Sequence, residues 1–150
     1  MMKTLFLQAP SFEGFDGGAG SRYQAKREIK SFWFPTWLAQ PAALVPDSVL
    51  IDAPPARKTL DDVLKVSNKS DLVVMHTSTP SFASDVKVAQ AIKDANPNVK
   101  IGFVGAKVAV EPLISLEDAP PVDFVAREEF DFTIKEIAEG RDWSKIDGMS

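Results

Sequence analysis

The sequence contains no cysteine and only one histidine. The first absence excludes disulfides, thiolate nucleophiles, cysteine-ligated zinc and any iron–sulfur cluster held within this chain. A net charge of −4, from 17 basic and 21 acidic residues, argues against a protein that binds the phosphates of nucleic acid. Apolar runs are short compared with the roughly 20 residues that cross a bilayer, and no secretory signal is visible. We therefore expect a cytoplasmic protein with no membrane span and no nucleic-acid partner.

What is present is an average globular composition, 45% apolar and 25% charged, over 150 residues, a length suited to one domain. Short, continuous apolar runs alternate with segments of helical spacing, the pattern of a parallel sheet covered by helices on both faces. The predicted strands are 4–7, 49–51, 71–76, 99–104 and 122–125, and the predicted helices are 36–44, 60–66, 82–95, 112–116 and 130–138. This order predicts a doubly wound α/β fold, flavodoxin-like, with a five-stranded parallel sheet in the order 2-1-3-4-5.

The predicted α/β domain occupies residues 1–140. Residues 141–150 show no periodicity, and we expect them to begin a linker. The segment 11–34 is long for a connection inside a compact domain, which makes it a candidate lid over a binding site. It ends in aromatic residues around Trp33, and Trp37 extends this cluster. The cluster could bind an apolar ligand or another domain, or part of it could belong to the core.

Ligands of this fold bind beyond the carboxyl ends of the strands. The glycines at 18 and 20 stand too far from the first strand for a dinucleotide fingerprint, and the sequence has no Walker motif. A phosphorylated receiver domain needs an acidic pair after the first strand, where this chain has Gln8, and an aspartate at the end of the third, where it has His76. Both of these functions are therefore disfavoured.

The residues at the predicted strand ends each have a chemical and a structural interpretation. His76 could be a general base or an axial metal ligand, or a partly buried, hydrogen-bonded side chain. The hydroxyls of Thr77 and Ser78 could bind a ligand or cap a helix. Gly105 permits close approach by a ligand or by the neighbouring helix. The charged residues that begin at Arg127 could form a ligand rim or a solvated surface.

Several of these positions match one family arrangement, in which a proline and a Leu-Ala pair enter the first helix and strands 2 to 5 end in characteristic residues. The matching residues are Pro35, Leu38, Ala39, Asp52, Thr77, Ser78, Gly105, Arg127, Glu129 and Thr133. Together they resemble the N-terminal cobalamin-binding-type domain of class B radical SAM enzymes. The chain departs from that pattern at Ala106, which replaces a second glycine, and after Arg127, where two further glycines are absent. It also lacks the motif that supplies an axial histidine to cobalamin in other carriers.

The resemblance implies a cobalamin lying over the strand ends. The residues that it places there are Gln8, Thr77, Ser78, Gly105, Ala106, Arg127 and Glu129. The longer segments 5–11, 22–28 and 31–41 are similar to radical SAM proteins of hopanoid biosynthesis, which are related to proteins labelled magnesium-protoporphyrin monomethyl ester cyclases.

This narrower resemblance implies a role in making the cyclitol side chain of hopanoids, with a [4Fe–4S] cluster and S-adenosylmethionine in a barrel domain that this chain lacks. The barrel would be the partner of this domain, and a small-molecule or hopanoid substrate would bind between them. A lipid substrate would bring such an enzyme to a membrane surface. The chain alone has no cysteine to hold the cluster, so we do not expect it to be catalytic. The alternative is a structural or substrate-lid domain that has kept the fold and lost the cofactor.

Overall fold

The computed structural model describes residues 1–10 and 34–150. Its core is a five-stranded sheet in the order β2-β1-β3-β4-β5, and every pair of neighbouring strands is parallel. The strands are β1 (Thr4–Gln8), β2 (Val49–Asp52), β3 (Leu72–His76), β4 (Lys100–Val104) and β5 (Phe124–Val125). The predicted fold class and strand order are confirmed.

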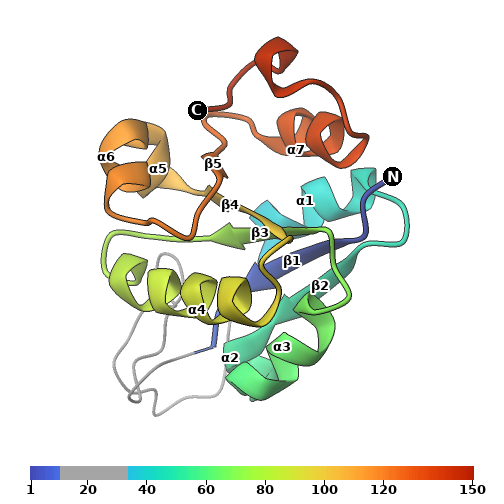
Figure 1. Cartoon of the computed structure of the whole chain (residues 1–150), viewed down its shortest axis with the longest axis vertical. Helices are drawn as coiled ribbons and strands as arrows, with labels where there is room; N and C mark the ends of the chain where they lie inside the picture. The colour runs from blue at the N-terminus through green and yellow to red at the C-terminus, as the bar shows by residue number, and fades with distance from the viewer. Residues whose placement is uncertain (11–33) are drawn as a thin grey trace.

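Helices cover both faces of this sheet (Figure 1). The helices are α1 (Thr36–Leu44), α2 (Ala53–Ala56), α3 (Leu60–Ser67), α4 (Phe82–Ala95), α5 (Ala106–Val110), α6 (Pro112–Glu117) and α7 (Asp131–Ala138). In Figure 1, α2, α3 and α4 lie on one side of the sheet, and α1 and α7 lie together on the other. The short helices α2 and α5 were missed by the sequence analysis, because Pro54 and Pro55 suggested a stop and the segment after Gly105 is too short to show a period.

Successive side chains of the central strands point to opposite faces of the sheet, which divides the core into two layers. Leu5, Leu7 and Met75 point toward α3 and α4, and all three are fully buried. Phe6 and Val74, from the same two strands, point toward α1 and α7. Burying each such side chain contributes about 1.5–3 kcal/mol, so both layers hold the sheet in place. The strands are therefore apolar on both faces, which explains their continuous apolar runs.

Local signals fix where the individual elements begin. The predicted N-cap Thr59 accepts a hydrogen bond from the backbone N–H of Asp62, whose carboxylate accepts one from the N–H of Thr59, so α3 starts with a capping box.

Gly102 in β4 leaves room for the ring of Phe124, because a Cβ at this glycine would lie 2.1 Å from the ring. The absence of a side chain at position 102 thus allows Phe124, and with it β5, to pack closely on β4.

The last ten residues pack against the domain. The 3₁₀ helix η2 (Trp143–Lys145) places the ring of Trp143 edge-on to Phe124, with 5.4 Å between centroids. Ser150 exchanges two backbone hydrogen bonds with Val125. The expectation that a linker begins here remains a prediction, whereas the packing was not predicted because single apolar residues without a period carry no signal for it. Within the described residues, no helix is long and apolar enough to cross a membrane.

Candidate functional site

The carboxyl ends of the strands form one edge of the sheet, and the structure brings several predicted site residues to it. Gln8 ends β1, Thr77 follows β3, Gly105 follows β4 and Arg127 lies just beyond β5. Because β1 and β3 are neighbours whose connections leave in different directions, the gap beside Gln8 is the switch point of the fold. We call this the carboxyl edge. The predicted lid, 11–34, lies outside the described residues except for Phe34, whose side chain is exposed.

At the switch point, Trp37 of α1 covers two polar side chains. Its indole N–H donates to Oε1 of the fully buried Gln8 at 3.4 Å. Its ring lies against the imidazole of His76, with 5.2 Å between centroids and a tilt of 46°. Trp37 therefore connects the ends of β1 and β3, a role that its place in the predicted aromatic cluster did not reveal. The Nε2 atom of Gln8 has no hydrogen-bond partner among the described residues.

Thr77 and Ser78 belong to a network around a buried carboxylate. The Thr77 hydroxyl donates to Oδ2 of Asp85 at 2.7 Å, and the Ser81 hydroxyl donates to the same oxygen at 2.8 Å. Ser78 lies against the Ser81 hydroxyl, with 2.8 Å between their oxygens. The sequence analysis left open whether these hydroxyls bind a ligand or cap a helix. The side chain of Thr77 is fully buried and serves the network at the start of α4.

Asp85 is the residue that sequence reasoning missed. Its side chain is buried, and burial raises its pKa to about 7 although the hydrogen bonds from Thr77 and Ser81 act in the opposite direction. An acidic residue in the first turn of a helix is common on a solvated surface, so only its proximity to the hydroxyl run 77–81 hinted at burial. The network fixes the loop from β3 to α4 at the carboxyl edge.

A glycine is required at position 105 by the backbone conformation and by the neighbouring atoms of the protein, without any ligand. Its φ is +122°, and a Cβ there would lie 2.4 Å from the carbonyl oxygen of Thr77 and 3.0 Å from Nε2 of His76. The close approach anticipated at this glycine is thus made by the end of β3. Ala106 follows as the first residue of α5 and lines a hollow of about 400 Å³ together with Thr79 and Lys107.

Beyond β5, the Nε atom of Arg127 is shielded from solvent and has no hydrogen-bond partner within residues 1–10 and 34–150. Glu128 has a left-handed backbone with φ 55°. A hollow of about 420 Å³ opens beside it, and its lining residues are Trp37, Gln40, Glu128, Glu129, Phe130 and Asp131. Burial, and secondarily the charge of Glu129, raises the pKa of Asp131. The predicted site residue Glu129 therefore lies at an acidic hollow that also reaches Trp37.

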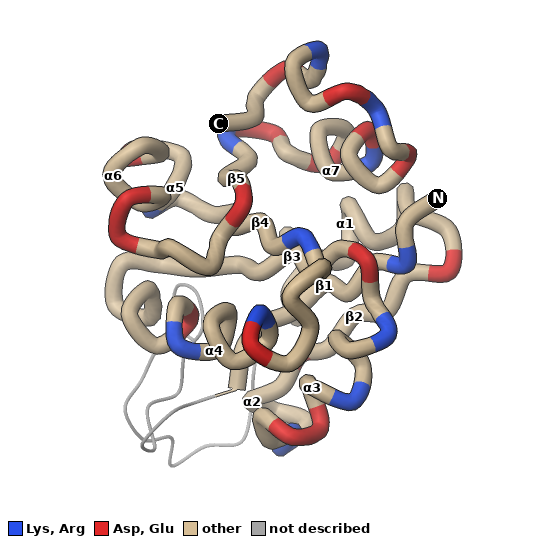
Figure 2. The backbone as a smooth tube through the Cα atoms, viewed as in Figure 1, with Lys and Arg blue, Asp and Glu red and all other residues tan. Residues whose placement is uncertain are grey.

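The charged residues do not gather into a basic surface. Figure 2 shows Lys and Arg interspersed with Asp and Glu along the drawn backbone. Among the residues that the structure describes, no group of His, Asp and Glu side chains could hold a metal ion. What the carboxyl edge offers to a ligand is thus hydrogen bonding, by Gln8 Nε2 and Arg127 Nε. We call these two atoms the edge donors.

Comparison with known proteins gives one distant similarity. The chain is 29% identical over 134 residues to an uncharacterized methyltransferase of Pyrococcus horikoshii, and the match covers 83% of this chain. It covers only 29% of that methyltransferase, so the chain spans less than a third of its relative. No model of a protein family matches the chain. The chain is therefore similar to part of a larger protein, and the name of that protein describes it as a methyltransferase.

Proposed function

We propose that this chain is a cobalamin-binding-type domain of a longer radical SAM enzyme, with hopanoid side-chain synthesis as its pathway. The observation that carries the proposal is the pair of edge donors, Gln8 Nε2 and Arg127 Nε, at the carboxyl edge of a 2-1-3-4-5 sheet. The similarity to part of a methyltransferase supports it, because methyl transfer is chemistry that cobalamin performs. The [4Fe–4S] cluster and S-adenosylmethionine would belong to a partner barrel in the same enzyme.

The spacing of the edge donors fits a large ligand. Gln8 ends β1 and Arg127 follows β5, so the two positions are three strand spacings apart, or roughly 14 Å. A compact anion cannot reach both, whereas cobalamin has amide and phosphate oxygens distributed over its corrin ring and nucleotide tail. Each buried donor that gains an acceptor recovers about 1–3 kcal/mol of desolvation penalty. Gln8 and Arg127 would therefore hold the ligand, and the bound cobalt would supply the site of methyl transfer.

The experiment is a titration of the purified chain with hydroxocobalamin, followed by desalting and an absorbance spectrum. Gln8→Met removes one edge donor at nearly constant volume and should reduce the retained corrin, whereas Gln90→Met, the same change on the exposed side of α4, should not. Gly105 variants are unsuitable, because a side chain there meets the backbone of Thr77. Absence of corrin from the folded wild-type chain would contradict the proposal.

A second candidate is a structural or substrate-lid domain without cofactor, in the same enzyme or in a protein similar to magnesium-protoporphyrin monomethyl ester cyclases. Two observations favour it: Thr77 turns its hydroxyl to Asp85, and Trp37 already covers Gln8 and His76. This candidate predicts no corrin absorbance. It also predicts that, in the full-length enzyme, Phe34→Ala lowers activity because the exposed Phe34 ring contacts the barrel or its hopanoid substrate.

A further inference from the structure

The orientation of the Gln8 amide is fixed by its neighbour. An indole N–H can only donate, so the atom of Gln8 that faces Trp37 Nε1 must be the oxygen, as the 3.4 Å contact to Oε1 has it. A reversed amide would set two donors against each other. The NH₂ group is consequently directed away from the indole, and it is a fully buried donor with no acceptor in the described part of the chain. Buried donors in native proteins are nearly always paired, so this one calls for an acceptor.

We propose that Trp37 is a positioning residue, which holds the Gln8 amide so that its NH₂ group donates to an acceptor oxygen of the ligand at the switch point. The acceptor is an uncharged amide carbonyl or a phosphate oxygen, both of which cobalamin carries. This inference rests on the proposed function. It assigns to Trp37 a role in recognition that is separate from its packing on His76.

The anchoring of Trp37 supports this role. Leu38, the next residue of α1, is fully buried in the layer between the sheet and α7, which fixes the helix. The contact with the His76 ring limits the tilt of the indole. The indole N–H is therefore a fixed reference point for the amide, although 3.4 Å is a long hydrogen bond and contributes modestly to stability. Its larger effect is on which end of the amide meets the ligand.

Trp37→Phe tests the inference, because it keeps an aromatic ring beside His76 and removes the N–H donor together with part of the indole. The amide can then rotate, and we expect hydroxocobalamin to bind roughly fivefold more weakly, as measured by titration of the corrin absorbance. Trp143→Phe is the matched control. It makes the same change near Lys100, at the opposite end of the sheet, and should leave binding unchanged.

A double-mutant cycle separates positioning from packing. Gln8→Met should weaken binding roughly tenfold, and Trp37→Phe should have no further effect in the Gln8→Met background, because the residue acts through the amide. Additive losses would overturn the inference. Circular dichroism and urea midpoints of all four proteins confirm that each is folded.

Cobinamide, which keeps the corrin amides and lacks the nucleotide, identifies the acceptor. An effect of Gln8→Met that persists with cobinamide indicates a corrin amide, and one that disappears indicates the phosphate.

The experiments distinguish a failure of the role of Trp37 from a failure of the cobalamin-binding function. Wild-type protein that retains hydroxocobalamin, with Trp37→Phe and Gln8→Met retaining it equally well, overturns the role of Trp37 and leaves the cobalamin-binding function intact. Folded wild-type protein that retains no corrin overturns both.

Discussion

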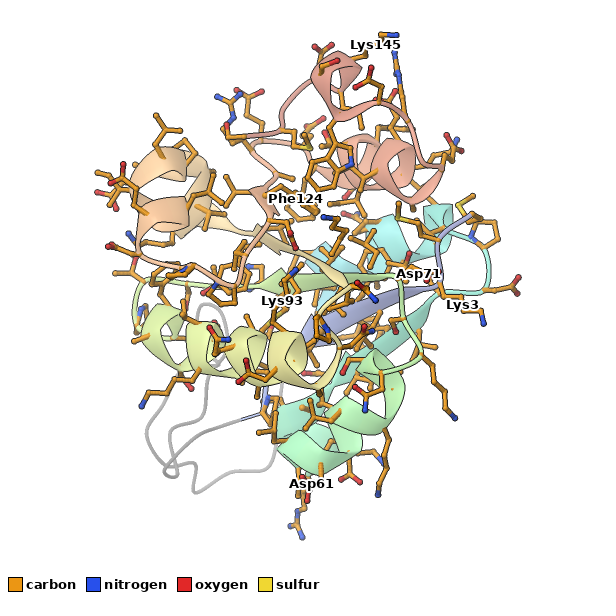
Figure 3. The ribbon with its side chains drawn as sticks, in the orientation of Figure 1. Lys3, Asp61, Asp71, Lys93, Phe124 and Lys145 are labelled. Atoms are coloured by element: carbon orange, nitrogen blue, oxygen red, sulfur yellow. The ribbon has the colours of Figure 1, made fainter. Side chains whose placement is uncertain are left out.

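The two ends of the sheet use their polar groups differently. At the amino end, Asp123 accepts from Lys93 Nζ at 2.7 Å and from the backbone N–H of Ile101 at 2.8 Å. The Lys3 N–H donates to Asp71 at 2.8 Å, and Figure 3 shows these two residues side by side. At the carboxyl end, the edge donors are buried without acceptors among the described residues. Polar groups at the amino end are thus paired within the protein, whereas the edge donors at the carboxyl end are the groups to which we propose that a ligand binds.

Even at the carboxyl edge, this comparison separates residues whose polar groups are paired within the protein from residues that we propose to bind a ligand. Gly105 and Asp85 lie there and are engaged by the protein itself, whereas Gln8 is engaged on one side only. Position at the edge is therefore a weaker guide to function than an unfilled hydrogen-bonding capacity. Four substitutions test this distinction.

The largest effect is expected for Gly105→Ala, because the new Cβ would meet the Thr77 carbonyl at 2.4 Å and the backbone has a φ of +122°. We expect a loss of about 3 kcal/mol or more in the free energy of unfolding, measured by urea denaturation. Gly140→Ala is the control: its φ is +78°, with no described atom within 4 Å of the added Cβ, so it should cost about 1 kcal/mol. Equal losses at both glycines would show that the Thr77 contact is unimportant.

At the amino end, Asp123→Ala removes the acceptor shared by Lys93 and the N–H of Ile101. We expect a loss of about 2 kcal/mol in unfolding free energy, since both donors are partly buried, and no change in ligand binding. Asp118→Ala, at an exposed position after α6, should change stability by less than about 0.5 kcal/mol. A change in corrin binding with Asp123→Ala would break the division between the two ends.

The raised pKa of Asp85 predicts that the free energy of unfolding depends on pH. Its folded pKa of about 7 lies above the unfolded value of 3.8, so the folded state binds more protons between these limits. The wild type should lose stability relative to Asp85→Asn as the pH rises from 5 to 7, on the order of 1 kcal/mol for each unit crossed. Asn can still accept from Thr77 and Ser81, so the two proteins should be alike at pH 4. Urea midpoints measured at several pH values give the difference, and parallel curves would contradict a buried Asp85.

The smallest effect is expected for Asn96→Ala. The Asn96 amide donates to the carbonyls of Ser67 and Ser70 at 3.3 and 3.2 Å, which connects the ends of α3 and α4. Its loss should cost about 1 kcal/mol in unfolding free energy. The exposed Asn98→Ala should be neutral in the same urea measurement.

The sequence predicts the fold well because the signals for a parallel sheet are local and strong. The continuous apolar runs, Thr59 as N-cap of α3 and the bounds of α4 all follow from neighbouring residues, and the structure confirms them. The site is predicted less completely, because it depends on contacts between distant segments. The bond from Trp37 to Gln8 spans 29 residues, and no periodicity reports it. The burial of Asp85 likewise depends on how α4 sits against β3. The expected cofactor and partner remain predictions.

The C-terminal segment has a consequence for the protein in solution. β5 is the outermost strand on its side of the sheet, and an open strand edge is a template for association with another chain. The paired hydrogen bonds between Val125 and Ser150, with the bridge from Ala126 to Met149, occupy this edge. Residues 148–150 therefore protect the β5 edge from pairing with a strand of another chain, and among the described residues the other outermost strand of the sheet is β2.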